Sequence, residues 1–441
     1  MSHPRPARYR VDPGGSVSGT LTVPGDKSIS HRALMLGAIA EGTTQVSGFL
    51  AGEDCLATAR ALAALGVKIE GLGSPQVRVH GVGAEGLRGA AAPLDLGNAG
   101  TAMRLMMGLL APQRFPSTLI GDSSLMRRPM ERVAAPLRLM GAQVSTESGH
   151  PPVQIHPAAQ LRAIHYELPV ASAQVKSAIL LAALGAQGRT RITEPAPSRD
   201  HTERMLAAFG AELLHEGATI AIEGGQVLRG TQLAVPADFS SAAFFIVAGC
   251  LAASQPLLIT NVGINPTRTG LIDLLQRMGA DIRLHRQAAQ APAGAEPVAD
   301  IEVRASRLHG ITVPEAMVPL AIDEFPVFFV AAACASGETV VRGAHELRVK
   351  ESDRLAATAA GLAVLGIEHQ LLPDGLWLRG AAGFDGGRID SRGDHRIAMA
   401  FAVAALKARA PLLIEDVANV ATSFPGFVGT ARGAGLHIQE L

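Results

Sequence analysis

SHRALMLGAIA (residues 30–40) and ALAALGVKI (residues 61–69) are the two signals of a repeat that recurs along this chain. The first is a helix-like run of small and apolar residues. The second is a leucine-rich helix that is closed by a glycine and followed by an extended segment. The pair occurs six times, and its closing glycines, which lie 75, 69, 69, 87 and 69 residues apart, are Gly66, Gly141, Gly210, Gly279, Gly366 and Gly435. Such self-similarity indicates one supersecondary structure used repeatedly.

The opening helices of the repeats are apolar nearly all round, so they are expected to be buried. Each helix is followed by an extended run, as in TTQVSGFL (43–50) and PLLIEDV (411–417). The repeat therefore reads β-α-β-α-β-β. The sequence predicts an α/β fold in which surface sheets cover buried parallel helices, like an α/β barrel turned inside out.

Six repeats are too many for one core, which predicts two similar domains of three repeats each. The first is expected to cover residues 23–239, and the second to combine residues 1–22 with residues 240–441. The terminal strand RYRVDPG (8–14) would then complete the last repeat. The longest glycine spacing contains HRQAAQAPAGAEPVAD (285–300), whose Ala, Pro and Gly content predicts a surface loop.

The composition of the 441-residue chain limits its partners. The 39 basic and 39 acidic residues balance, and one Trp and two Tyr leave little for base stacking, so no nucleic acid is expected. Residues 1–22 lack a signal-peptide core, and no apolar run reaches the ~20 residues that span a membrane. Cys55, Cys250 and Cys334 lie far apart without a CxxC motif, which indicates buried thiols and a cytoplasmic protein.

The segment PGDKSISHR (24–32) places cations and a hydroxyl group at the start of a buried helix. Lys27 and Ser28 lie at the helix start, and Arg32 follows about one turn later. Free N–H groups and the positive end of the helix dipole favour an anion there, and this set of side chains suits a phosphate. The alternative is that Ser28 caps the helix and both cations are solvated.

Three further motifs begin helices in the first half of the chain. LGNAGT (96–101) allows close approach of backbone to a ligand, although a plain turn explains it equally well. GDSSLMRRPM (121–130) holds two arginines, at least one of which is expected to face an anion, while Arg127 could belong to a surface turn. ASAQVKS (171–177) and SRDH (198–201) offer neutral hydrogen-bonding groups, with ordinary capping as a slightly favoured alternative.

The richest cluster of charged residues lies in the second half of the chain. Asp-Glu (323–324) precedes the fifth buried helix, RVKESDR (348–354) follows, and Asp-His-Arg (394–396) opens the sixth. Lys350 and Arg354 would share a helix face if their segment is helical. The cluster is either a salt-bridged surface or a site that pairs anion-binding cations with proton-transferring carboxylates. Carboxylates at the start of apolar helices favour the second interpretation, a site.

Other common motifs are weak or missing. GVGAEG (81–86) matches a dinucleotide-binding pattern, but Pro93 follows and a long helix does not, so no dinucleotide is expected. The sequence contains no HExxH, Walker A, GxSxG or Cys/His metal spacing, and its 14 histidines are scattered. We therefore expect neither a metal ion nor a cofactor.

Taken together, the motifs resemble those of the 5-enolpyruvylshikimate-3-phosphate synthase (3-phosphoshikimate 1-carboxyvinyltransferase) family. From about residue 20 to residue 430, and in the family's order, they are PGDKSISHRA, GNAGTAMR, RRPM, SAQVKSA, RDHTE, RVKESDR, DHRIAM and SFP. The resemblance implies transfer of the enolpyruvyl group of phosphoenolpyruvate to the 5-hydroxyl of shikimate 3-phosphate, with release of phosphate. The implied mechanism is addition and elimination through a tetrahedral intermediate, within the shikimate pathway of aromatic amino acid biosynthesis.

The resemblance also implies roles for individual residues. Those expected to bind shikimate 3-phosphate are Lys27, Ser28, Arg32, Ser172, Ala173, Gln174, Ser198 or Arg199, Asp323 and Lys350. Those expected to bind phosphoenolpyruvate are Lys27, Gly100, Arg128, Gln174, Arg354 and Arg396. Asp323 would be the base at the 5-hydroxyl, and Glu351 or Lys27 would protonate C3.

Two residues depart from the family's pattern. Thr422 stands where some members carry a lysine that contacts phosphoenolpyruvate, so that contact is not expected here. Glu346 stands where some members carry an asparagine, which weakens that substrate contact as well. Gly100 bears on the herbicide glyphosate, because in this family alanine at that place crowds the inhibitor. Glycine therefore permits sensitivity without ensuring it.

The nearest alternative is the related enolpyruvyl transferase that acts on UDP-N-acetylglucosamine. That enzyme usually carries a cysteine in the loop matching residues 121–130, where this chain has none, and it lacks the DKSISHR pattern. A non-catalytic repeat scaffold is a second alternative, but it would not need charged groups at the start of buried helices.

The resemblance finally implies that two domains close on the substrates. The chain would cross between them near residues 22–24 and 238–242, and neither half would hold the full set of site residues. The fourth repeat, which begins at residues 238–241 without an obvious ligand group, is interpreted as a hinge. A monomer is expected.

Overall fold

The computed structural model describes residues 7–286 and 295–441, which form a mixed α/β protein with several small sheets. These residues divide into two compact units, each with a hydrophobic core of its own. Unit 1 contains the described residues of Met1–Pro24, Pro236–Ala289 and Pro297–Leu441. Unit 2 contains those of Gly25–Val235 and Gln290–Glu296.

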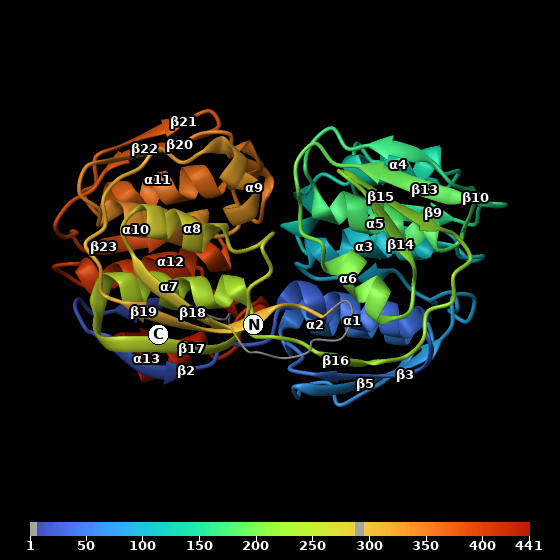
Figure 1. The fold of residues 1–441 in the computed structure, drawn as a ribbon, viewed down its shortest axis with the longest axis horizontal. Coiled ribbons are helices and arrows are strands. Elements are labelled where there is room, and N and C mark those ends of the chain that lie inside the picture. Colours follow the sequence, from blue (N-terminus) through green and yellow to red (C-terminus); the bar gives the residue numbers. More distant parts are fainter. Residues whose placement is uncertain (1–6, 287–294) are drawn as a thin grey trace, which may run out of the picture. The chain divides into compact units, whose positions relative to one another are not determined.

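Six helices form the interior of the two units, and the prediction that they are buried is confirmed. They are α1 (Lys27–Ile39), α3 (Gly100–Leu110) and α5 (Ala173–Ala183) in unit 2, and α7 (Phe239–Ala252), α10 (Phe325–Ala333) and α12 (His395–Ala404) in unit 1. Every residue of α10 is buried, because its sequence is apolar on all sides. Within their units, α3 packs against α1 and α5, and α10 packs against α7 and α12 (Figure 1).

A second helix in each repeat ends at one of the six repeated glycines. These helices are α2 (Glu53–Ala64), α4 (Glu131–Leu139), α6 (His201–Ala208), α8 (Gly270–Arg277), α11 (Arg354–Val364) and α13 (Phe427–Ala434). All six glycines have φ between 72° and 110°, a left-handed conformation that favours glycine and terminates a helix. The period seen in the sequence is therefore a repeat of backbone conformation.

The three larger sheets of unit 2 share one topology. Their strand orders are β16 (Gln232–Ala234), β3 (Glu41–Ser47), β5 (Gln76–Val82), β4 (Lys68–Glu70); β6 (Leu94–Asp95), β7 (Ser117–Ile120), β9 (His150–His156), β8 (Gln143–Glu147); and β11 (His165–Glu167), β13 (Arg189–Thr193), β15 (Thr219–Glu223), β14 (Leu213–Glu216). In each sheet the first two strands are parallel and the others pair antiparallel. A short parallel pair, β10 (Leu161–Arg162) and β12 (Ala186–Gln187), lies beside them.

Two sheets of unit 1 repeat this topology, and the third has only three strands, which all pair antiparallel. Its strand orders are β2 (Val17–Leu21), β17 (Ala253–Gly263), β19 (Val298–Arg304), β18 (Asp281–Arg286); β23 (Gly387–Asp390), β24 (Leu412–Glu415), β1 (Tyr9–Val11), β25 (Ile438–Glu440); and β20 (Glu338–Val341), β22 (Gly375–Arg379), β21 (His369–Leu372). Strand β1 pairs with both β24 and β25, so the N-terminal strand completes the last repeat as predicted.

The two chain crossings exchange strands between repeats. Strand β2 precedes α1 in the sequence but pairs with β17 of unit 1. Strand β16 precedes α7 but pairs with β3 of unit 2. The first and fourth repeats thus each receive their parallel edge strand from the other.

Short helical segments connect the larger elements. They are η1 (Leu125–Arg127), η2 (Glu315–Met317), α9 (Val318–Ala321), η3 (His345–Val349), η4 (Ala405–Lys407) and η5 (Ala418–Thr422). No single described helix is both long enough and apolar enough to cross a membrane. The pair 315–321 and 325–333 passes that test only jointly and is bent by 117°.

The surface loop predicted for residues 285–300 is shorter than expected. Strand β18 continues to Arg286, which pairs with Ala299, and β19 begins at Val298, which pairs with Gly263 of β17. Residues 287–294 lie outside the described residues. The side chain of Glu296 is only 7% exposed, so the prediction of a surface position is wrong for it.

Candidate active site

The starts of the three inner helices of unit 2 lie together. Gln174, at the second position of α5, donates from Nε2 to Thr101 Oγ1, at the second position of α3, over 2.9 Å. Arg32 of α1 donates from Nη2 to Ser177 Oγ of α5 over 2.9 Å. Since these contacts join the first two turns of each helix, the positive ends of three helix dipoles gather at one place.

Helix α1 begins at Lys27 because Asp26 caps it. The Asp26 carboxylate accepts a hydrogen bond from the Ile29 backbone N–H over 2.9 Å. The alternative in which Ser28 provides the cap is therefore wrong. Lys27 Nζ donates to Asp54 Oδ2 over 3.0 Å, and its side chain is 19% exposed, so it is held in place rather than solvated.

Arg32 is buried and held by three hydrogen bonds. Its guanidinium donates to Thr202 Oγ1 over 2.7 Å, to Ser177 Oγ over 2.9 Å and to the Ser28 carbonyl over 3.0 Å. Burial lowers the pKa of Arg32 to about 10, which still leaves it charged at neutral pH. Burial also lowers the pKa of His31 to about 3, so the positive charge of this helix start resides on Lys27 and Arg32.

The two arginines of the 121–130 segment differ in burial. Arg127 is exposed, as the surface-turn alternative allowed, whereas Arg128 is buried and donates from Nη2 to Asn98 Oδ1 over 2.6 Å. A Cβ added to Gly100 would lie 2.8 Å from Arg128 Nη1. Glycine at position 100 is thus what lets the guanidinium approach the start of α3.

At the start of α5, one residue is a cap and another is a hydrogen-bonded amide. Ser172 accepts from the Val175 backbone N–H over 3.5 Å, so the capping alternative is correct for it. Ala173 is the first helical residue. Gln174 Oε1 accepts from Arg104 Nη1 over 2.5 Å, which fixes its amide group beside Thr101.

In unit 1 the charged motifs form a buried cluster around Arg354. This residue is 1% exposed, and its guanidinium contacts Asp394 at 2.8 Å, Asp323 at 3.1 Å and Glu351 at 2.5 Å. Burial alone would lower the pKa of Arg354, but the three carboxylates outweigh it and raise the pKa above its ordinary value. The alternative of a solvated, salt-bridged surface is excluded for this residue.

Asp323 is the carboxylate on which three cations converge. Its Oδ1 lies 3.3 Å from Lys350 Nζ and 3.1 Å from Arg354 Nη1, and its Oδ2 lies 4.0 Å from Arg396 Nη2. Arg396 also donates to the Asp323 carbonyl over 3.1 Å. Asp323 immediately precedes Glu324 and α10, and it is 8% exposed.

The RVKESDR segment is not one helix. Segment η3 ends at Val349, Lys350 has an extended ψ of −152°, and α11 begins only at Arg354 because Asp353 caps it through the Ala356 N–H. Lys350 and Arg354 therefore share no helix face. They nevertheless meet at the same oxygen of Asp323.

Sequence reasoning missed a second buried network, at the start of the fourth repeat. Asp238 caps α7, and Ser240 Oγ donates to Glu324 Oε1 over 2.5 Å. Arg268 donates to Ser240 over 2.6 Å, and Glu324 lies 3.5 Å from Arg396. The Asp-Phe-Ser-Ser start signalled the cap, but the lone Arg268 gave no signal. Polar groups at this helix start thus support Arg396.

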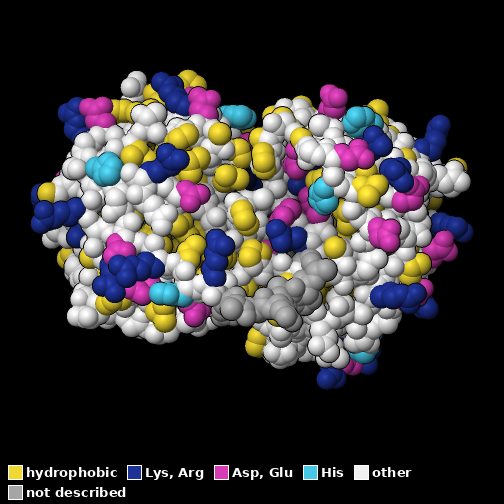
Figure 2. All heavy atoms as spheres, viewed as in Figure 1, with side chains coloured by type: hydrophobic (Ala, Val, Ile, Leu, Met, Phe, Trp, Pro, Cys, Tyr) yellow, Lys and Arg dark blue, Asp and Glu magenta, His cyan; other side chains and the backbone are white. Residues whose placement is uncertain are grey.

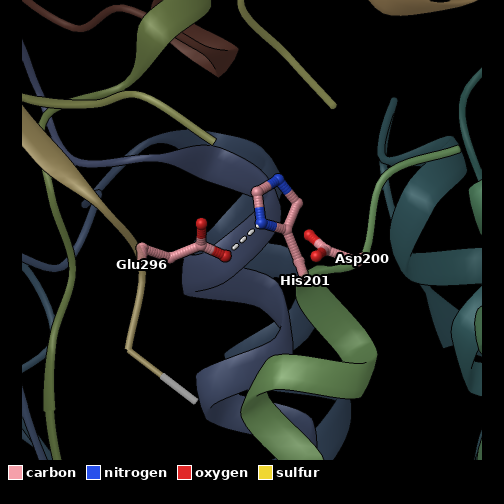
Figure 3. Close-up of side chains that lie close together, drawn as sticks. All are labelled: Asp200, His201 and Glu296. Atoms are coloured by element: carbon pink, nitrogen blue, oxygen red, sulfur yellow. Dashed lines mark hydrogen bonds and ion pairs between the residues drawn. The ribbon is translucent and has the colours of Figure 1, made fainter. Parts of the chain in front are cut away.

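One group of described side chains brings possible metal ligands together. Ligand atoms of Asp200, His201 and Glu296 lie within 4.8 Å of one another (Figure 3). However, His201 Nδ1 is hydrogen-bonded directly to Glu296 Oε1 over 2.5 Å, and Arg204 Nε donates to Asp200 over 2.8 Å. These contacts already give both carboxylates partners within the protein, so we assign this group no metal. Glu296 was missed because its segment was interpreted as a surface loop.

Thr422 and Glu346 are the two residues that depart from the family pattern. The Thr422 hydroxyl donates to the Asn419 carbonyl over 2.7 Å, so it has a hydrogen-bond partner within the protein. Glu346 lies in η3. On the face drawn in Figure 2, Lys and Arg side chains are interspersed with Asp and Glu rather than gathered in one basic patch.

Comparison with known proteins gives similarity over almost the full length. A family model described as EPSP synthase (3-phosphoshikimate 1-carboxyvinyltransferase) matches residues 11–430. The 3-phosphoshikimate 1-carboxyvinyltransferase of Methylococcus capsulatus is 56% identical over 438 residues, which covers 99% of each chain. That of Alkalilimnicola ehrlichii is 58% identical, covering 98% of this chain and 96% of its own. The solved structure of EPSP synthase from Acinetobacter baumannii has a TM-score of 0.87 and 51% identity, covering 99% and 100% of the two chains.

Proposed function

The chain belongs to the EPSP synthase family, and from this premise we propose how its residues perform the family's reaction. It is a 3-phosphoshikimate 1-carboxyvinyltransferase of the shikimate pathway, which serves aromatic amino acid biosynthesis. Its substrates are phosphoenolpyruvate and shikimate 3-phosphate. The structural observation that carries the assignment of roles is Asp323, buried among Lys350, Arg354 and Arg396.

Asp323 is proposed as the base at the 5-hydroxyl of shikimate 3-phosphate. As its proton moves to the carboxylate, the hydroxyl oxygen bonds to C2 of phosphoenolpyruvate, and C3 gains a proton from Glu351 or Lys27. In the second step the bond between C2 and the phosphate oxygen breaks, and C3 loses a proton again. Lys350, Arg354 and Arg396 contact this carboxylate and hold it in place.

The cations are proposed to divide between the two substrates. Lys27, Arg128, Arg354 and Arg396, with Gly100 and Gln174, bind phosphoenolpyruvate. Shikimate 3-phosphate is bound by Lys27, Ser28, Arg32, Ser172, Ala173, Gln174, Ser198 or Arg199, and Lys350. The starts of α1, α3 and α5, which lie together in unit 2, add partial positive charge for the phosphate of shikimate 3-phosphate. Local charge of this kind lets a protein of zero net charge collect two anions.

We further propose that the two halves are similar domains of three repeats, at 23–239 and at 1–22 with 240–441. The repeated glycine conformations and the shared sheet topology support this division. The proposed base, Asp323, belongs to one half, and Lys27, which is proposed to bind both substrates, belongs to the other. We therefore propose that the substrates draw the two halves together for reaction. Small-angle scattering should show a smaller radius of gyration with both ligands than without them, and an unchanged radius would contradict closure.

A monomer in the cytoplasm is the expected state of the enzyme. The free thiols of Cys55, Cys250 and Cys334 are compatible with a reducing compartment, and burial raises the pKa of Cys250 and of Cys334 to about 12. Light scattering at assay concentration would test the monomer.

The direct test of function is release of phosphate from phosphoenolpyruvate by the purified chain. We expect release only when shikimate 3-phosphate is present, with formation of the enolpyruvyl product. UDP-N-acetylglucosamine serves as the control acceptor and should give no release. Release with UDP-N-acetylglucosamine alone would instead support the related transferase.

A substitution at Gly100 tests the placement of phosphoenolpyruvate. In Gly100→Ala the new Cβ must displace Arg128 Nη1, which lies 2.8 Å away and belongs to a buried, hydrogen-bonded side chain. We expect the displaced Arg128 guanidinium to lose one charged hydrogen bond to phosphoenolpyruvate. This loss should raise KM for phosphoenolpyruvate by about 10- to 100-fold, and glyphosate inhibition should weaken. KM for shikimate 3-phosphate should stay unchanged.

The matched control is Gly429→Ala on α13, where an added Cβ meets nothing within 4 Å. That variant should keep both KM values. Initial-rate kinetics with each substrate varied in turn measure the effect. An unchanged KM for phosphoenolpyruvate in Gly100→Ala would place that substrate elsewhere.

A further inference from the structure

A buried group of ion pairs lies among the residues assigned to shikimate 3-phosphate. Lys176, on α5, is 1% exposed, and its ammonium lies 2.7 Å from Glu194 Oε2 and 2.7 Å from Glu203 Oε1. One buried cation thus serves two carboxylates whose side chains are 8% and 3% exposed. Such an arrangement costs desolvation energy, and stability alone is a weak reason for it.

One arm of this group ends at Ser198. Glu194 accepts from Lys176 through Oε2 and from the Ser198 hydroxyl through Oε1. Lys176 Nζ also lies 3.5 Å from the Ser198 carbonyl. Ser198 belongs to the segment between β13 and α6, residues 194–200, which has no helix or strand. The side-chain contacts with Lys176 and Glu194 therefore help to define the place of this serine.

The other arm ends at Arg32. Glu203 lies in the first turn of α6, and burial raises its pKa against the pull of Lys176. Its neighbour Thr202 accepts from Arg32 Nε over 2.7 Å. Ser177, the neighbour of Lys176, accepts from Arg32 Nη2 over 2.9 Å and is hydrogen-bonded to Thr202 over 2.7 Å. The Lys176–Glu203 pair thus ties together the two helices that hold the guanidinium.

We propose that Lys176 is a positioning residue for shikimate 3-phosphate, acting through Ser198 and Arg32 without touching the substrate. The inference rests on the function proposed above. A ligand binds more tightly to groups that are already held in place, because less ordering is required on binding. Since Asp323 lies in unit 1, outside this group, the effect should fall on affinity for one substrate and not on the chemical step.

The test compares wild type with Lys176→Met/Glu203→Gln. This pair of changes removes one positive and one negative charge, so the net charge of the buried group is unchanged. Glu194 loses its cation, and thermal unfolding of the same preparation therefore accompanies the kinetics. We expect KM for shikimate 3-phosphate, and its Kd measured by calorimetry, to rise about tenfold. The kcat value and KM for phosphoenolpyruvate should stay within about twofold, as expected for lost binding alone.

Two further variants separate positioning from general structure. Adding Ser198→Ala to the pair should raise KM by less than Ser198→Ala does in wild type, because Glu194, which accepts from the Ser198 hydroxyl, has already lost its contact with Lys176. Val153→Ala, a buried truncation in β9 of the same unit, should lower the melting temperature without changing either KM. Equal changes for both substrates, or the same change in Val153→Ala, would overturn the proposal.

The outcomes distinguish failure of the proposed function from failure of the proposed role of Lys176. Absence of phosphate release in wild type would refute the proposed function itself. An active wild type, with a variant whose KM for shikimate 3-phosphate stays within about twofold, would refute only the role of Lys176.

Discussion

Asp323→Asn is expected to lower kcat by about 10²- to 10⁴-fold, the usual contribution of a general base. Asparagine keeps the shape of the side chain and an oxygen for Lys350 and Arg354, which contact Asp323 Oδ1 at 3.3 Å and 3.1 Å. It cannot take the proton of the 5-hydroxyl. The loss should therefore appear in kcat, while KM for each substrate changes only a few fold.

Steady-state kinetics and thermal unfolding of the same preparation measure this effect. Asp374→Asn is the matched control, since it removes one carboxylate from an exposed ion pair with Arg342 in the same unit. It should leave kcat unchanged. Near wild-type kcat with unchanged KM in Asp323→Asn would contradict the assignment of the base.

Much of the fold follows from local signals. The glycines after the second helices were predictable because a left-handed residue ends a helix, and the structure gives all six a positive φ. The buried helices were predictable because they are apolar on every side. The strands that pair with β2 and β16 were not predictable. Strands of five and three residues carry no pattern that names their partner.

Charge alone pointed to the candidate site only where charged residues sit beside an apolar helix in the sequence. Lys27, Asp323 and Arg396 stood out in this way. Arg268 and Glu296 did not, because their partners lie far away along the chain, at Ser240 and at His201. Long-range pairs of this kind depend on the packing of whole helices, which a single sequence does not specify.

Arg354→Met is expected to lower the free energy of unfolding by about 3–5 kcal/mol, the cost of removing one partner from a buried ion pair. Methionine has a similar length but no charge. Asp394, Asp323 and Glu351 would then remain close together without the guanidinium that contacts all three. Activity should fall as well, because Arg354 is also proposed to bind phosphoenolpyruvate and because Asp323 loses one of its cations.

Arg379→Met is the matched control for this substitution. Arg379 also pairs with two carboxylates, Glu338 at 2.6 Å and Glu368 at 3.3 Å, but its side chain is 53% exposed. Water screens those pairs, so urea unfolding of this variant should match wild type closely. If Arg354→Met unfolded at the same urea concentration as Arg379→Met, burial would not govern the strength of the Arg354 cluster. A large loss confined to Arg354→Met would instead show that this one cation holds three acidic groups in the geometry that the proposed chemistry needs.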